Sequence, residues 1–280
     1  MIFKKNNPGC PCCDDCPCAC FTFNSDLKST KGGHEFTAAG TTAFTSGKLG
    51  NALEVAYNST PSANALSAPD NSCFSFEGGL SFWFWLYTNP DCTETNTTIS
   101  YVLSKGDYFP GNTAQWAVAL PVNKQCNQSS NFQYAAAIKK STGGYQIIGY
   151  DDTDYETGTD TDAAWTFYFQ YYDPNVGTNG TYYTSINGAG FAHNANSTAI
   201  GPAESDGGVA LENPIVSNSE PLKLFEAVSS QSGSLKIDNL GFCKNIPAAL
   251  SDGTTTEQQM AARAASLYNS GTGKACNEWK

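Results

Sequence analysis

The sequence predicts an all-β protein built as a two-sheet antiparallel sandwich, with one short helix near its end. Two observations predict this class. Charged residues make up only 15% of the 280-residue chain, against about 25% in an ordinary soluble domain. From about Phe21 onward, short apolar runs alternate with clusters of Gly, Asn, Asp and Pro, as in antiparallel strands joined by turns. The hydrophobic share of 40% is enough for one large core.

Two expected strands carry apolar side chains on both faces. They run over Leu80–Tyr87 and Trp165–Tyr172, and successive side chains of a strand point to opposite faces. This pattern is typical of a strand buried in the middle of a layered fold. It is also what an aromatic platform for sugar rings or a partner would require. The residues that would stack on glycans are Trp83, Trp85, Tyr168 and Tyr172.

One helix is expected, over Thr255–Tyr268. It begins with Thr followed by Glu and Gln, which is a capping pattern, and Gly271 follows its end. No other segment shows a comparable helical pattern.

The first twenty residues form a distinct head. It is too short and too rich in Pro and Gly for a core of its own, so residues 1–20 are expected to be a separate anchoring or cross-linking segment before a domain at 21–280. Its closely spaced thiols would converge on a soft ion such as Zn²⁺. Alternatively, they would form disulfides within the head, to other subunits or to the body. The six head cysteines are Cys10, Cys12, Cys13, Cys16, Cys18 and Cys20.

Five further cysteines lie in the body. Cys92 and Cys126 flank one segment and would form one bridge. Cys243 and Cys276 would form a second, tying the last strand to the C-terminal tail. Cys73 is then left over, either as a buried thiol or as the partner of a head cysteine.

Several segments follow one another in the order of a known family pattern. They are Phe21–Asp26, Gly47–Leu53, Leu80–Leu86, Val102–Asp107, Trp165–Tyr172, Tyr183–Gly188, Leu235–Phe242, Ala249–Ser251 and Leu267–Gly271. In this order they resemble the laminin-G-like branch of the concanavalin A-like lectin/glucanase superfamily. The resemblance covers residues 20–273 and implies a curved two-sheet jelly roll with neighbouring N- and C-termini. That fold hosts lectins, glycosidases and passive spacers, so it names no single function.

Catalytic patterns are missing from the sequence, and we expect no enzyme. The glucanases of this superfamily use a Glu-x-Asp-x-x-Glu strand with paired carboxylates. Here Glu204 and Asp206 start such a pattern, but Val209 stands in its third place. Serine and cysteine hydrolases need a His beside the nucleophile. The chain has only His34 and His193, both among small residues.

Two places could hold Ca²⁺. Oxygen ligands are dense in an acidic run that departs from an EF-hand, because Gly158 is one position late and Ala163 replaces the closing Glu. A solvated acidic turn is the alternative interpretation. The run offers Asp152, Asp154, Glu156, Asp160 and Asp162. The resemblance implies a second place at Asp26 and Asp238, between the first and last strands. No cofactor is required for the fold.

Charge and cysteine content limit the partners and the location. A net charge of −11 opposes binding to nucleic acid, and no run of about 18 apolar residues would span a membrane. No general secretory signal peptide is visible, yet eleven cysteines favour an oxidising place such as a cell surface or a virion.

The sequence therefore predicts a non-catalytic structural or adhesive subunit of an exterior assembly, either a virion or a cell-surface appendage. Its head would anchor it or cross-link it into a homo-oligomer. The alternative is a lectin-like module that binds surface glycans.

Overall fold

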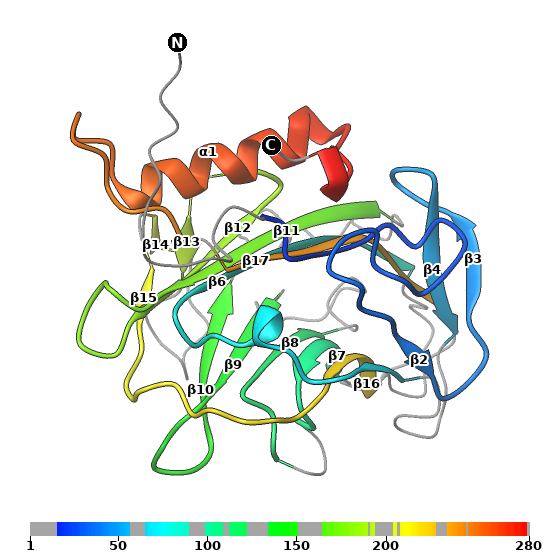
Figure 1. Cartoon of the computed structure of the whole chain (residues 1–280), viewed down its shortest axis with the longest axis horizontal. Helices are drawn as coiled ribbons and strands as arrows, with labels where there is room; N and C mark the ends of the chain where they lie inside the picture. Colours follow the sequence, from blue (N-terminus) through cyan, green and yellow to red (C-terminus); the bar gives the residue numbers. More distant parts are fainter. Residues whose placement is uncertain are drawn as a thin grey trace.

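Two antiparallel sheets face each other across a shared core in the computed structural model, and a helix lies over one of them (Figure 1). This confirms the predicted all-β sandwich. The structure describes residues 16–56, 65–89, 99–108, 112–121, 134–150, 164–189, 191–193, 204–205, 208–227, 234–244 and 246–278.

Sheet 1 is the sheet beneath the helix. Across it the strands are β15 (Val209–Ala210), β12 (Thr181–Ile186), β11 (Ala164–Asp173), β6 (Leu80–Asn89), β17 (Ser234–Cys243), β4 (Asn51–Ala56) and β3 (Ala43–Ser46), and β1 (Ala19–Phe21) also pairs with β17.

Sheet 2 is the opposite sheet, and a separate small ladder lies beside it. Across sheet 2 the strands are β10 (Tyr145–Tyr150), β9 (Tyr134–Lys139), β8 (Trp116–Pro121), β7 (Ile99–Lys105), β16 (Leu222–Ala227), β5 (Leu66–Ala68) and β2 (Thr37–Ala38). The small ladder pairs β13 (Ala192–His193) with β14 (Glu204–Ser205).

Strand β6 lies between β11 and β17 and is buried on both faces. Its side chains Phe82 and Phe84 enter the core between the sheets. Its side chains Trp83 and Trp85 point the other way, into a second cluster beneath the helix. The alternation predicted for this strand is confirmed, and its apolar character on both sides is explained by a cover on each face.

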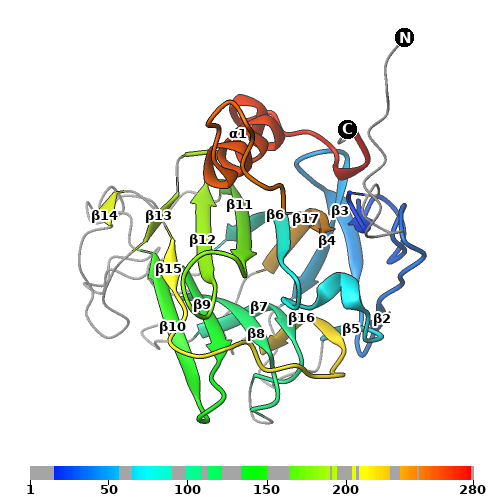
Figure 2. The ribbon, with the colours of Figure 1, turned by 60° about the vertical axis from the view of Figure 1, so that its left-hand side comes forward.

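The cover on the outer face is α1 (Thr256–Tyr268), followed by η4 (Asn269–Gly271) and η5 (Cys276–Glu278) (Figure 2). Thr255 and Gln258 form a reciprocal capping box at its start, as the sequence predicts. A stripe at helical spacing faces sheet 1 and buries Met260, Ala264 and Leu267. Within the described residues, no helix is both long and apolar enough to cross a membrane.

Strand β17 changes partner along its length. Its first half, Ser234–Ile237, pairs with β4, and the register then shifts between Asp238 and Gly241. Beyond this bulge, its last residues pair with β1. The N-terminal segment therefore fills the edge that β4 leaves open, and this position brings the head cysteines to the body.

Candidate functional site

Three head cysteines are joined to the body, and we call these three bridges the clasp. Cys16 pairs with Cys243 on β17, with 5.1 Å between their Cα atoms. The other two bridges are Cys18–Cys73 at 6.0 Å, to η1 (Ser72–Phe74), and Cys20–Cys276 at 5.7 Å, to η5.

Alternation in an extended chain explains why three neighbouring cysteines reach three separate elements. Cys16 and Cys20 face the cluster beneath α1, whereas Cys18 faces the core between the sheets. The segment is held in line by backbone hydrogen bonds, with the Cys18 amide donating to the Phe242 carbonyl at 2.7 Å. Residues 16–20 thus lie within the sandwich.

The clasp corrects one predicted bridge. Cys243 and Cys276 do not pair with each other, because the edge strand places Cys16 beside the first and Cys20 beside the second. For Cys73, the alternative of a head partner is confirmed. In this structure Cys16, Cys18 and Cys20 form disulfides, whose sulfurs offer no thiolate to a metal, so zinc binding by the head stays a prediction for its other cysteines. The remaining cysteines, Cys10, Cys12, Cys13, Cys92 and Cys126, lie outside the described residues.

The predicted sugar platform does not reach the surface. Trp83 and Trp85 are each 1% exposed beneath α1, and the Trp85 and Tyr268 rings stack with centroids 5.8 Å apart. Tyr168 and Tyr172 lie on the opposite face of sheet 1, in the core between the sheets. Because both faces of the sheet are covered, these four rings cannot stack on a glycan in this structure.

Of the predicted calcium ligands, only Asp26 and Asp238 lie in the part of the chain that the structure describes. The acidic run from Asp152 to Asp162 lies outside the described residues. The Asp26 carboxylate accepts the Lys28 amide of its own turn at 3.0 Å. In the described part of the chain, no group of three or more His, Cys, Asp or Glu side chains converges as metal ligands.

Asp238 instead holds the turn between β3 and β4. Its carboxylate is fully buried and accepts hydrogen bonds from the Leu49 amide at 2.8 Å and the Asn239 side chain at 2.6 Å. Burial outweighs these bonds and raises the pKa of the Asp238 carboxyl to about 6 from 3.8.

This raised pKa predicts a pH dependence of stability. The folded state holds the Asp238 proton more tightly than the unfolded chain, so the stabilisation is present below pH 4 and is lost as the pH rises to about 6. The change amounts to about 3 kcal/mol. In urea titrations from pH 4 to 7, we expect wild type to lose stability relative to Asp238→Asn. If the difference in unfolding free energy between wild type and Asp238→Asn stays constant from pH 4 to 7, the raised pKa of Asp238 is wrong.

Of the two histidines, only the side chain of His34 is described by the structure. His34 packs its ring against Phe74 with centroids 4.9 Å apart, and burial lowers its pKa. His193 lies in β13, where its backbone pairs with Glu204.

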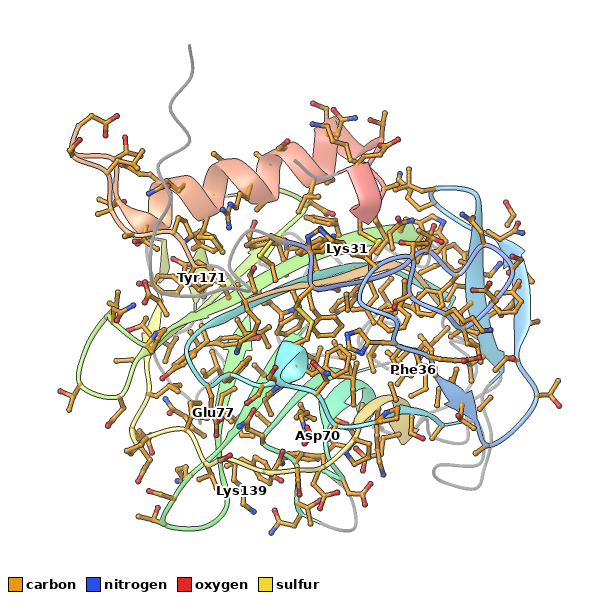
Figure 3. All side chains as sticks on the ribbon, viewed as in Figure 1. Lys31, Phe36, Asp70, Glu77, Lys139 and Tyr171 are labelled. Atoms are coloured by element: carbon orange, nitrogen blue, oxygen red, sulfur yellow. A yellow bond between two sulfur atoms is a disulfide. The ribbon has the colours of Figure 1, made fainter. Side chains whose placement is uncertain are left out.

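The outer face of sheet 2 carries a cluster of partly exposed tyrosines, which we call the tyrosine row: Tyr101, Tyr108 and Tyr145. The Tyr108 ring lies between the other two, with centroid distances of 4.4 Å to Tyr101 and 4.6 Å to Tyr145. The Lys139 ammonium lies 4.8 Å from the centre of the Tyr145 ring. Figure 3 shows Lys139 on the side of the molecule away from α1, whereas Tyr171 lies just beneath the helix.

Small side chains make room for the tyrosine row. Tyr101 comes from β7 and Tyr145 from β10, with β8 and β9 between them. On these middle strands, Ala117 pairs with Ala137. The residues on either side of each alanine point into the core between the sheets, so the two alanines face outward. A larger residue at either place would occupy the outer face of sheet 2 on the strands between Tyr101 and Tyr145.

A buried carboxylate fixes the loop that carries Tyr108. Glu226, 1% exposed, accepts a hydrogen bond from the Ser104 hydroxyl and another from the Tyr108 amide, each at 3.0 Å. Burial raises the pKa of the hydroxyls of Tyr101, Tyr108 and Tyr145, so these side chains stay neutral. The row is therefore an uncharged, amphipathic surface on a rigid support.

Sequence reasoning missed the tyrosine row. Tyr101 and Tyr145 lie on different strands, and Tyr108 lies in a loop outside the strand pattern. Only the sheet order β10-β9-β8-β7 brings them together. No motif at fixed spacing marks them.

The described elements define a helix-covered, two-sheet antiparallel β-sandwich. No known family model and no curated protein sequence matches the chain. Solved structures do match it. The binding domain of Paraclostridial Mosquitocidal Protein 1 aligns over 91% of this chain and 52% of its own, with 12% identity and a TM-score of 0.59. The binding domain of Botulinum neurotoxin DC, in complex with rat synaptotagmin II, aligns over 91% and 51%, with 13% identity and a TM-score of 0.60.

The same neurotoxin domain in complex with SialylT aligns over 90% of this chain and 52% of its own, with 13% identity and a TM-score of 0.59. The chain therefore spans about half the length of the structures it resembles. At this identity the likeness establishes the sandwich fold alone.

Proposed function

We propose that this chain is a non-catalytic, adhesive binding module of the laminin-G-like type, displayed on the exterior of a cell or virion. The observation that carries the proposal is the clasp, because disulfides form in oxidising surroundings such as the cell exterior and are rare in the reducing cytosol. The remaining head cysteines, Cys10, Cys12 and Cys13, would link copies of the chain into an assembly. The similar solved structures support a binding role, because their names describe binding domains.

Intact mass and oligomeric size of the oxidised protein, with and without reductant or chelator, test this role. We expect covalent multimers that collapse to monomers on reduction. The matched control is Cys10→Ser with Cys12→Ser and Cys13→Ser, which should remain monomeric while keeping the clasp. Wild-type protein that stays monomeric under oxidising conditions would contradict cross-linking through the head. A monomer that loses zinc to chelator would instead assign these thiols to a metal.

Carbohydrate is the second candidate role, and the tyrosine row favours it. Among the described residues, the exposed large apolar side chains are Val176 and Leu250, which lie in separate loops. That surface therefore offers no apolar patch for a protein partner. The tyrosine row presents partly exposed aromatic rings that carry hydroxyls, and such amphipathic groups suit the apolar faces and hydroxyl groups of sugars.

Glycan-array binding tests this second role. We expect Tyr108→Ala to lose about tenfold or more in affinity for any glycan that wild type binds, because the central ring is removed. Tyr108→Phe keeps the ring and should lose less. The matched control is Tyr87→Ala, since Tyr87 is a partly exposed ring beneath a lysine ammonium on sheet 1. Equal losses in Tyr108→Ala and Tyr87→Ala, or no binding by wild type, would rule the tyrosine row out as a sugar site.

A further inference from the structure

From the connectivity of the clasp we infer that the protein is a force-bearing link, in which tension between the segment before Cys20 and the segment after Cys276 passes along covalent bonds and leaves the sandwich folded. This function is separate from ligand binding and does not depend on which ligand the module holds. It depends only on which residues the three disulfides join.

The Cys20–Cys276 bridge closes a loop with a sequence separation of 256 residues, which contains both sheets and α1. Tension between a point before Cys20 and a point after Cys276 follows this bridge. The strands inside the loop carry none of that load. Such tension therefore does not unfold the sandwich.

Tension between the N-terminal segment and a ligand on the body enters by another bridge. Cys16 is the first clasp residue met from the N-terminal side, and its partner Cys243 ends β17. Strand β17 pairs with β6 from Ser234 to Cys243, apart from the bulge. The load therefore enters an interior strand of sheet 1 rather than its edge.

Hydrogen bonds alone would not hold the N-terminal segment. Strand β1 has three residues, which pair with β17 at Ala19, Cys20 and Phe21, and on its other side it makes a single β-bridge, from Cys20 to Lys31. So short a ladder offers few hydrogen bonds against a pull, and each opens in turn when an edge strand is peeled away. The three bridges replace this weak attachment by covalent bonds.

Burial protects the Cys20–Cys276 bridge from reductant. Both of its cysteines have no exposed surface, whereas Cys16 and Cys18, which each supply one sulfur of the other two bridges, are half-buried. Thiol–disulfide exchange requires access of an attacking thiolate to a sulfur atom. A folded body under tension therefore keeps the Cys20–Cys276 bridge out of reach.

Single-molecule stretching of the oxidised full chain, with handles at Met1 and Lys280, tests the inference. About two dozen residues lie outside the Cys20–Cys276 loop, and they extend by about 80 Å in all. We expect no further lengthening below forces that break covalent bonds. In Cys20→Ser with Cys276→Ser, the Cys16–Cys243 bridge becomes the limit, and the extension should rise to about 180 Å as α1 and the tail unravel.

The matched control is Cys18→Ser with Cys73→Ser, which removes a bridge but leaves the Cys20–Cys276 path, so its extension should stay near 80 Å. Thiol titration of the same samples checks the bridges. Free thiols at clasp positions in the oxidised protein would overturn the inference. So would lengthening of wild type by several hundred Å without reductant, or equal extensions in the two double variants.

Discussion

Replacing Cys20 and Cys276 together by serine should lower the free energy of unfolding by about 4 kcal/mol. The bridge joins β1 to the tail that follows α1. With Cys16–Cys243 still closed, the loop that reopens is about 40 residues long, and the expected loss follows from the entropy of closing it. The helix should be the first element to separate, because its buried face is a single stripe over Trp83 and Trp85.

Urea denaturation measures the loss, and hydrogen exchange locates it. In the Cys20→Ser, Cys276→Ser variant we expect faster hydrogen exchange of the α1 amides. We also expect a red shift of the tryptophan fluorescence, because the indoles become exposed to solvent. The matched control is Cys18→Ser with Cys73→Ser, whose bridge attaches to η1 on the core side. This control variant should lose a similar free energy of unfolding, but its α1 amides should exchange no faster than in wild type. Unchanged exchange in both variants would show that packing alone holds the helix.

Gly241→Ala should be among the most damaging single substitutions in the chain. A Cβ atom at Gly241 would lie 2.2 Å from Cζ2 and 2.3 Å from Cε2 of Trp83. The indole cannot move away, because it is 1% exposed and packs against Phe169 with centroids 6.3 Å apart beneath the helix. We expect a loss of about 3 kcal/mol in the free energy of unfolding from this overpacking.

A double-mutant cycle separates this contact from a general intolerance of side chains at the bulge. Trp83→Ala alone should cost about 3 to 5 kcal/mol through the cavity it leaves. In that background, Gly241→Ala should cost less than about 1 kcal/mol, because the clashing ring is gone. Urea denaturation of the four proteins gives the coupling energy. Additive losses would mean that the backbone at Gly241, rather than the indole, sets the requirement.

Local patterns in the sequence were sufficient for the elements around the core. Alternation in Leu80–Tyr87 predicts which side chains share a face, and the structure places them so. The capping residues around Thr255 predict the start of the helix correctly. Such features depend on neighbours a few residues apart, so the sequence records them directly.

The sites depend on contacts between distant residues. The sequence pattern of β6 is compatible with aromatic rings exposed on a platform and equally with rings buried in a layer. Trp83 and Trp85 are buried because α1 covers that face of the strand. The spacing of the cysteines did not determine which of them pair. The pairing is set only when β1 lies beside the half of β17 that β4 does not cover.

The sequence by itself therefore determined the class of fold, the course of its main strands and helix, and the acidic character of the protein. The tertiary structure alone decided the three bridges of the clasp, the cover over the tryptophans and the meeting of Tyr101, Tyr108 and Tyr145. The physical reason is range. Periodicity and capping act within a few residues, whereas these contacts join segments tens to hundreds of residues apart, and they exist only once the sheet order has brought those segments together.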